Sequence, residues 1–113
     1  MGKKGMILMK QIQLGTSNQK VSSVILGCMR INGAEHPERI IETAFDNGIN
    51  FFDHADIYGG GECETIFASA LAKTSIKREE LFIQTKCGIV PGVMFDFSKK
   101  HIIESVEGSL KRL

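Results

Sequence analysis

The sequence has no tryptophan, only two prolines, and a net charge of just +1. Its 14 basic residues are scattered among 13 acidic ones, which argues against nucleic-acid binding, because that function needs basic residues clustered on one face. No apolar run approaches the ~20 residues of a membrane-spanning helix. The apolar stretch at 6–9 is too short for a signal peptide. We therefore expect a cytoplasmic protein that binds neither nucleic acid nor membranes.

Cysteine is also scarce. The three cysteines, Cys28, Cys63 and Cys87, are odd in number and widely spaced. This pattern fits neither a disulfide framework nor a zinc ribbon. We interpret them as buried or near-site thiols in a reducing compartment.

The chain alternates short strand patterns with longer helical patterns. Residues 9–14 alternate apolar and polar side chains, as a half-buried strand does, and 20–22 can return antiparallel to complete a hairpin. A polar loop is predicted at 77–80, and a loop containing Pro91 and Gly92 follows the last strand. The remaining predicted strands are 24–27 (fully buried), 49–52 and 81–86, and the predicted helices are 36–47, 62–73 and 98–113.

Strands that alternate with helices predict a parallel sheet with helical crossovers. Three parallel strands cannot close a barrel, which needs eight strands and about 250 residues. The chain is therefore a small open α/β sheet or the first part of a (β/α)8 barrel, and the last helical pattern favours the barrel because it has no stop signal before Leu113. In that case the third strand lies at an open edge, and core-facing residues such as Phe82 and Val106 lack partners. We expect this open edge to make the chain self-associate.

The most informative stretch is 49–62, where a buried apolar strand leads into acids, a histidine, the only tyrosine and three glycines. Barrels place their chemistry at such carboxyl ends of strands. Asp53 ends this strand, and Lys86 stands at the equivalent place on the next strand, about 4.8 Å away. With Tyr58 on the loop above, these groups suit proton transfer to a carbonyl, because a nearby ammonium lowers the pKa of a tyrosine. The alternative is a structural Asp–Lys ion pair with a tyrosine at the rim.

Other motifs in the chain give weaker signals. His54 and Asp56 could hold a divalent ion with Cys28 or Cys87, but His54 should face away from Asp53 in a strand, so we predict no metal site. The glycines at 59–61 could present amides to a phosphate, yet they lack the spacing of a phosphate-binding loop, and a flexible turn is favoured. The pair at 29–30, a methionine and an arginine, could contact the phosphates or nicotinamide of a cofactor.

Several motifs in one order resemble the aldo-keto reductase superfamily. The segment 50–59 resembles its signature, in which Asp, Ala, Tyr and Gly follow at fixed spacing and a Glu comes soon after. The segment 82–86 is similar to the strand that carries the catalytic lysine of that family. The segment 14–29 is similar to its N-terminal hairpin and first barrel strand, and 105–113 to its third helix.

The resemblance implies a (β/α)8 barrel that reduces aldehydes or ketones with NADPH. Tyr58 would be the general acid, Lys86 would lower its pKa, and Asp53 would hold Lys86. Hydride would pass from the nicotinamide to the carbonyl carbon while the Tyr58 hydroxyl stabilises the developing oxyanion. The residues expected at the cofactor are Gly27, Met29, Arg30 and Asp53.

By the same resemblance, residues 1–8 form a flexible N terminus and 9–113 the N-terminal part of the barrel domain. The histidine expected as a fourth catalytic residue would fall beyond Leu113, so the chain alone is expected to be inactive. Two alternatives remain. One is a non-catalytic family member that binds NADPH as a regulatory channel subunit, and the other is a small open α/β binding domain.

Overall fold

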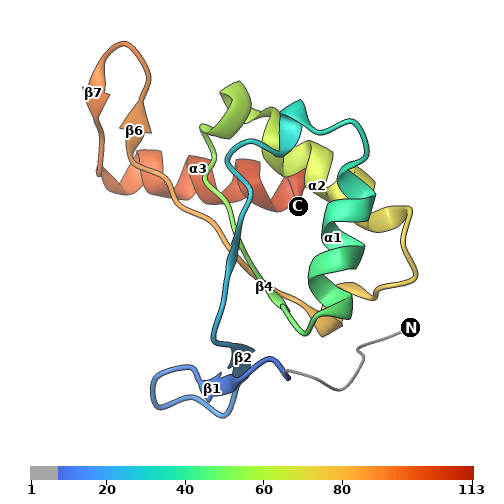
Figure 1. Ribbon diagram of the computed structural model, residues 1–113. Coiled ribbons are helices and arrows are strands. Elements are labelled where there is room, and N and C mark those ends of the chain that lie inside the picture. Colours follow the sequence, from blue (N-terminus) through green and yellow to red (C-terminus); the bar gives the residue numbers. More distant parts are fainter. Residues whose placement is uncertain (1–7) are drawn as a thin grey trace.

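The computed structural model describes residues 8–113 (Figure 1). Of the expected flexible N terminus, residues 1–8, only Leu8 lies among the described residues, and it is exposed. The strands are β1 Gln11–Gln13, β2 Lys20–Ser22, β3 Leu26–Gly27, β4 Phe51–Asp53, β5 Phe82–Gln84, β6 Ile89–Val90 and β7 Met94–Phe95. The helices are α1 Pro37–Asp46, α2 Glu62–Ala72 and α3 Lys99–Arg112, with 3-10 turns η1 Ile31–Gly33, η2 Tyr58–Gly61 and η3 Arg78–Glu80.

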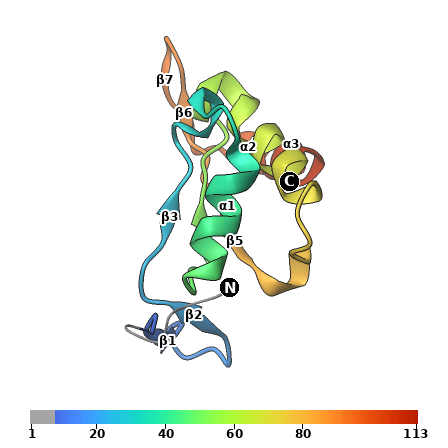
Figure 2. The ribbon, with the colours of Figure 1, turned by 45° about the vertical axis from the view of Figure 1, so that its right-hand side comes forward.

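A three-stranded parallel sheet in the order β3-β4-β5 organises the fold, as the sequence predicts. Helix α1 connects β3 to β4, and α2 connects β4 to β5. The two helices pack against each other beside the sheet (Figure 2). The described residues therefore form an open α/β sheet, in which all three strands end at the same rim.

The core lies between this sheet and helices α1 and α2. Phe52 from β4 and Phe67 from α2 are fully buried, with their ring centroids 5.3 Å apart. Ile41 of α1 is also fully buried, because the apolar residues of that helix recur on its sheet-facing side. Helix α1 begins with Pro37 in its first turn and is followed by Gly48 at φ 91°, the left-handed stop expected from the sequence.

The β1–β2 hairpin is antiparallel, as predicted, and lies at the far end of the sheet from the β6–β7 hairpin (Figure 1, Figure 2). It is tied to the start of β4 by two hydrogen bonds. The Ser22 backbone N–H donates to Asn50 Oδ1 at 2.8 Å, and the Asn50 N–H donates to Ser22 Oγ at 3.2 Å. This contact fixes the hairpin beneath the N-terminal ends of the parallel strands.

The strand predicted at 24–27 needs correction, and two predicted loops contain further structure. The strand at 24–27 is not fully buried: only its last two residues pair, and Val24 and Ile25 are 49% and 48% exposed, because this segment lies at the edge of the described sheet. The loop around Pro91 and Gly92 is the turn of the β6–β7 hairpin. The polar loop at 77–80 contains a 3-10 turn, η3.

Helix α3 begins where predicted, with the Ser98 hydroxyl accepting a hydrogen bond from the His101 backbone N–H at 3.2 Å. Its predicted apolar face is exposed in the described structure, and Val106 is 48% exposed. That face consists of Ile102, Ile103, Val106 and Leu110. Self-association through these surfaces stays a prediction. None of the helices within residues 8–113 is both long and apolar enough to span a membrane.

Candidate functional site

The candidate site lies at the carboxyl ends of β4 and β5. Asp53 is the last residue of β4, Lys86 follows β5 by two residues, and Tyr58 opens η2. Backbone hydrogen bonds extend the parallel pairing past the strand ends: the His54 N–H donates to the Gln84 carbonyl at 2.7 Å, and the Asp56 N–H to the Lys86 carbonyl at 3.0 Å. These bonds hold the loop that leads to Tyr58 beside the segment that carries Lys86.

The Lys86 ammonium is saturated by acceptors. Its Nζ donates to both Asp53 carboxylate oxygens at 2.8 Å and to the His54 carbonyl at 2.7 Å. Partial burial works against the charge of Lys86, but the interactions with Asp53 and Tyr58 outweigh it and raise the pKa of Lys86 above 10.5. Lys86 is therefore a fixed cation at the strand rim.

The same balance acts on Asp53. Burial works against its charged form, but the hydrogen bonds from Lys86 and Gln84 outweigh it and lower the pKa of Asp53 below 3.8. The carboxylate is thus ionised at neutral pH and serves as the counterion that orients Lys86.

Tyr58 lies next to this cation, with the Lys86 Nζ 5.2 Å from the centroid of its ring. That distance is within the range of a cation–π contact. The structure therefore brings together the acid, the amine and the phenol that the sequence predicted. The roles of these three groups in catalysis stay a prediction.

Tyr58 and Lys86 both face a hollow of about 250 Å³. Its other side is built by the segment after β5 and by the β6–β7 hairpin region, where the rings of Phe95 and Phe97 stack 6.0 Å apart. Gly88 is at φ 127°, and a Cβ there would collide with the Phe97 ring, so this wall requires glycine. The hollow therefore combines a phenol and an ammonium group with an apolar wall, a mixed lining that is typical of small-molecule sites.

The predicted cofactor residues lie partly at this rim. Gly27 is the register partner of Asp53, and the Cys28 N–H donates to the Asp53 carbonyl at 2.9 Å. Arg30 lines a separate hollow of about 240 Å³ together with Gly27. Met29 is 52% exposed and lines neither hollow. The structure thus brings Gly27 to Asp53, and it does not bring Met29 to the candidate site.

His54 faces away from Asp53, as the alternation of a strand requires. It is fully buried against Phe67, with ring centroids 4.5 Å apart in an edge-on arrangement. Both ring nitrogens lack a hydrogen-bond partner in the described structure, and burial lowers the pKa of His54 to about 4. Among residues 8–113, no cluster of three acidic, histidine or cysteine side chains has the arrangement of a metal site.

The glycine turn is sterically required. Gly59, Gly60 and Gly61 have φ of 62°, 66° and 98°, which other residues rarely adopt. A Cβ at Gly59 would also lie 2.8 Å from Cys63 Sγ and 2.9 Å from Asn32 Nδ2. The turn lets the chain reverse between Tyr58 and helix α2.

Two residues of functional interest were not predicted from the sequence. The first is Gln84, whose Nε2 donates to Asp53 Oδ1 at 2.7 Å. The second is Glu64, which is fully buried where α2, α3 and β5 meet, and which accepts hydrogen bonds from Arg112 Nε at 2.6 Å and Thr85 Oγ1 at 2.6 Å. The alternation of β5 could have placed Gln84 on the Asp53 side. The ion pair of Glu64 could not be predicted in this way, because it joins residues 48 positions apart.

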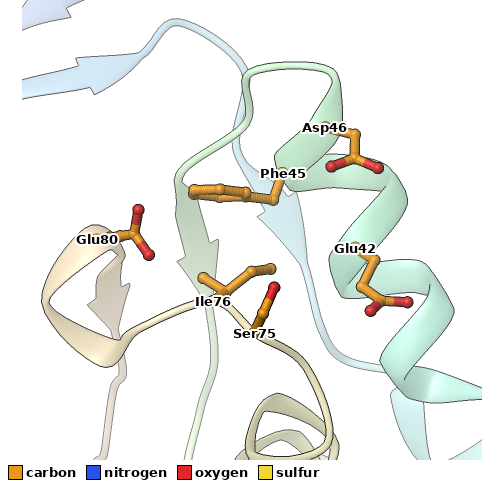
Figure 3. Close-up of a pocket in the computed structure, with 6 residues that line it drawn as sticks. All are labelled: Glu42, Phe45, Asp46, Ser75, Ile76 and Glu80. Atoms are coloured by element: carbon orange, nitrogen blue, oxygen red, sulfur yellow. The ribbon is translucent and has the colours of Figure 1, made fainter. Parts of the chain in front are cut away.

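A third hollow, of about 500 Å³, lies at the opposite ends of the strands, between the end of α1 and the segment leading to β5 (Figure 3). Its polar lining consists of three carboxylates and a serine hydroxyl. One of them, Glu80, already accepts a hydrogen bond from the Lys77 N–H at 2.8 Å. This hollow offers no acid–base arrangement like that of Asp53, Lys86 and Tyr58, although it has the larger volume.

Comparisons with known proteins agree on one family. Residues 23–113 match the model of the Aldo/keto reductase family. The uncharacterized oxidoreductase YcsN of Bacillus subtilis is 42% identical, over 93% of this chain and 39% of its own length. The versiconal hemiacetal acetate reductase of Aspergillus parasiticus is 34% identical, over 93% of this chain and 39% of its own length.

The fold agrees as well. The holo form of the aldo-keto reductase AKR11C1 from Bacillus halodurans superposes with a TM-score of 0.80 at 37% identity, covering 93% of this chain and 36% of that one. This match confirms the predicted fold class, part of a (β/α)8 barrel. The chain spans well under half the length of these relatives.

Proposed function

This chain belongs to the aldo/keto reductase family, and from that premise we propose that it supplies the proton-donating part of an active site that reduces aldehydes or ketones. The observation that carries the proposal is the Asp53–Lys86 pair, with both carboxylate oxygens 2.8 Å from Nζ, beside the ring of Tyr58. The chain spans about two fifths of its curated relatives, so the proposal concerns the whole enzyme to which such a segment contributes.

Tyr58 is the general acid in this proposal. As the carbonyl carbon is reduced, negative charge develops on its oxygen, and the Tyr58 hydroxyl donates its proton to that oxygen. A free tyrosine has a pKa near 10 and is a poor acid at neutral pH, so it needs a neighbour that stabilises the phenolate. The Lys86 ammonium is that neighbour, and Asp53 keeps it charged and oriented.

NADPH is the cofactor in the proposal, and it supplies the hydride that forms the new C–H bond. Two of the predicted residues suit a dinucleotide: Gly27 lies beside Asp53, and Arg30, which lines the separate hollow, is a cation suited to a phosphate. A cytoplasmic location is part of the same proposal, since the free thiols Cys28, Cys63 and Cys87 suit a reducing compartment.

The test uses a chimera in which residues 23–113 replace the matching segment of the Bacillus halodurans aldo-keto reductase. Oxidation of NADPH is followed with a panel of aldehydes and ketones, and cofactor binding is measured separately by fluorescence. We expect turnover in the chimera and its loss by about 100-fold or more in Lys86→Met, while Lys99→Met, an exposed lysine on α3, changes nothing. Binding of NADPH without any turnover would favour the non-catalytic, regulatory kind of family member, and full turnover in Lys86→Met would refute the role of Lys86.

A further inference from the structure

We propose that Gln84 is a positioning residue that holds the Asp53 carboxylate against Lys86. The inference rests on the proposed function and deepens it, because it adds a group to the proton-donating arrangement. Gln84 and Asp53 are register partners on β5 and β4, so their side chains leave neighbouring strands at the same level and on the same face.

Two donors hold the Asp53 carboxylate, one from Gln84 and one from Lys86. Gln84 Nε2 lies 2.7 Å from Asp53 Oδ1, and Lys86 Nζ lies 2.8 Å from both Oδ1 and Oδ2. Lys86 lies two residues after Gln84, just beyond the end of β5, and both side chains reach the Asp53 carboxylate. Oδ1 therefore accepts from both donors, and rotation of the carboxylate would break contacts with both.

The chemical identity of the side chain suits this role. A glutamine amide donates a hydrogen bond without adding charge, so it fixes Asp53 without competing with Lys86 for the carboxylate. A lysine or arginine at position 84 would compete, and a glutamate would place a second carboxylate next to Asp53. Burial raises the pKa of Asp53, and the hydrogen bond from Gln84 joins the one from Lys86 in lowering it.

The same contacts fix the position of Lys86 beside Tyr58. Lys86 reaches the Tyr58 ring at 5.2 Å while both carboxylate oxygens hold its ammonium. Without Gln84, Asp53 can turn about its terminal torsion and accept water on Oδ1. The ammonium is then held by one oxygen fewer and is less well fixed beside Tyr58.

The test compares Gln84→Met, which keeps the length of the side chain and removes the donor, with Gln84→Glu, which also adds a charge. Gln19→Met, an exposed glutamine of the first hairpin turn, is the matched control. In the 113-residue chain, carbon-13 NMR follows the titration of the Asp53 carboxyl, and the amide spectrum shows that each variant is folded. In the chimera described above, kcat and KM are measured across pH.

We expect Gln84→Met to raise the pKa of Asp53 and to lower kcat by about threefold to tenfold with KM unchanged, the size of effect that one lost hydrogen bond gives. Gln84→Glu should raise that pKa further, and Gln19→Met should change neither quantity. An unchanged Asp53 titration in folded Gln84→Met would overturn the inference. If the pKa rises while the chimera itself shows no turnover, the positioning role of Gln84 stands and the proposed reaction fails, so the two outcomes are distinguishable.

Discussion

Protonation of His54 should control the stability of this fold in mildly acidic solution. The imidazole is fully buried against Phe67, and neither ring nitrogen has a hydrogen-bond partner in the described structure. Burial disfavours the imidazolium, the nearby charges of Glu64 and Asp53 favour it, and Lys86 opposes it, with the net result that the pKa falls from 6.5 to about 4. The folded protein therefore holds a neutral histidine over most of the pH range.

The sign and size of the effect follow from proton linkage. The unfolded chain binds a proton at His54 with a pKa near 6.5, whereas the folded chain binds it only near 4, so acid favours unfolding. Stability is full above about pH 6.5 and falls as the pH drops toward 4. Between about pH 7.5 and about pH 5, this single group should remove about 2 kcal/mol from the free energy of unfolding. The lower end of this pH range lies above 4.5, the ordinary pKa of glutamate, so protonation of carboxylates contributes little to the change in stability.

Urea unfolding followed by circular dichroism at these two pH values measures the effect. In His54→Phe, which keeps a ring against Phe67 and removes the titrating group, the loss between the two pH values should nearly vanish. His36→Gln is the control, because the His36 side chain is 49% exposed, and it should keep the wild-type dependence. An equally large loss in His54→Phe would show that His54 does not carry the dependence, and the reasoning from its burial would be refuted.

Three further predictions concern contacts that stabilise the fold. Gly48→Ala places a side chain at φ 91° with its Cβ 2.5 Å from Met9 Cβ, and should cost about 1–3 kcal/mol in urea unfolding; an unchanged midpoint would contradict the strain argument. Arg112→Met removes the cation that Glu64 meets at 2.6 Å and should cost about 3 kcal/mol, much of it recovered when Glu64→Met is added; no recovery in the double variant would contradict the assigned pairing. Ser98→Ala removes the N-cap of α3 and should cost about 1 kcal/mol, seen as faster amide exchange in its first turn, whereas unchanged exchange would deny the cap a role.

Much of the fold could be predicted because the relevant signals are local. The stop of α1 at Gly48 and the start of α3 at Ser98 are determined by residues next to each other in the sequence, and the structure confirms both. The approach of Lys86 to Asp53 could also be predicted, because parallel strands of equal length end at one rim. These are features in which short-range pattern and sheet geometry determine the outcome.

The rest depends on partners distant in the sequence. Val24 belongs to an apolar run typical of a buried strand, yet burial requires a neighbour on its far side, and the described residues supply none. The apolar face of α3, which includes Val106, is exposed for the same kind of reason. Glu64 reads as a surface residue of a helix, and only the meeting of α2 with Arg112 of α3 makes it a buried ion pair.

The β6–β7 hairpin was missed because its strands are only two residues each, Ile89–Val90 and Met94–Phe95. Such short runs carry no periodicity that separates a strand from a loop. Gln84 was missed because a polar residue near the end of a strand is expected to face solvent. Its contact with Asp53 becomes evident only when the register of the two strands is known. Register is a property of two strands together and is weakly encoded in either one.

Tyr58→Phe in the chimera tests the claim that Tyr58 donates the proton to the carbonyl oxygen. The change removes one hydroxyl and keeps the ring that lies 5.2 Å from Lys86 Nζ. We predict that kcat falls by about 100-fold to 10,000-fold, the usual contribution of a general acid, while NADPH binding by fluorescence stays unchanged. Turnover of Tyr58→Phe within a few-fold of the unsubstituted chimera would contradict the claim.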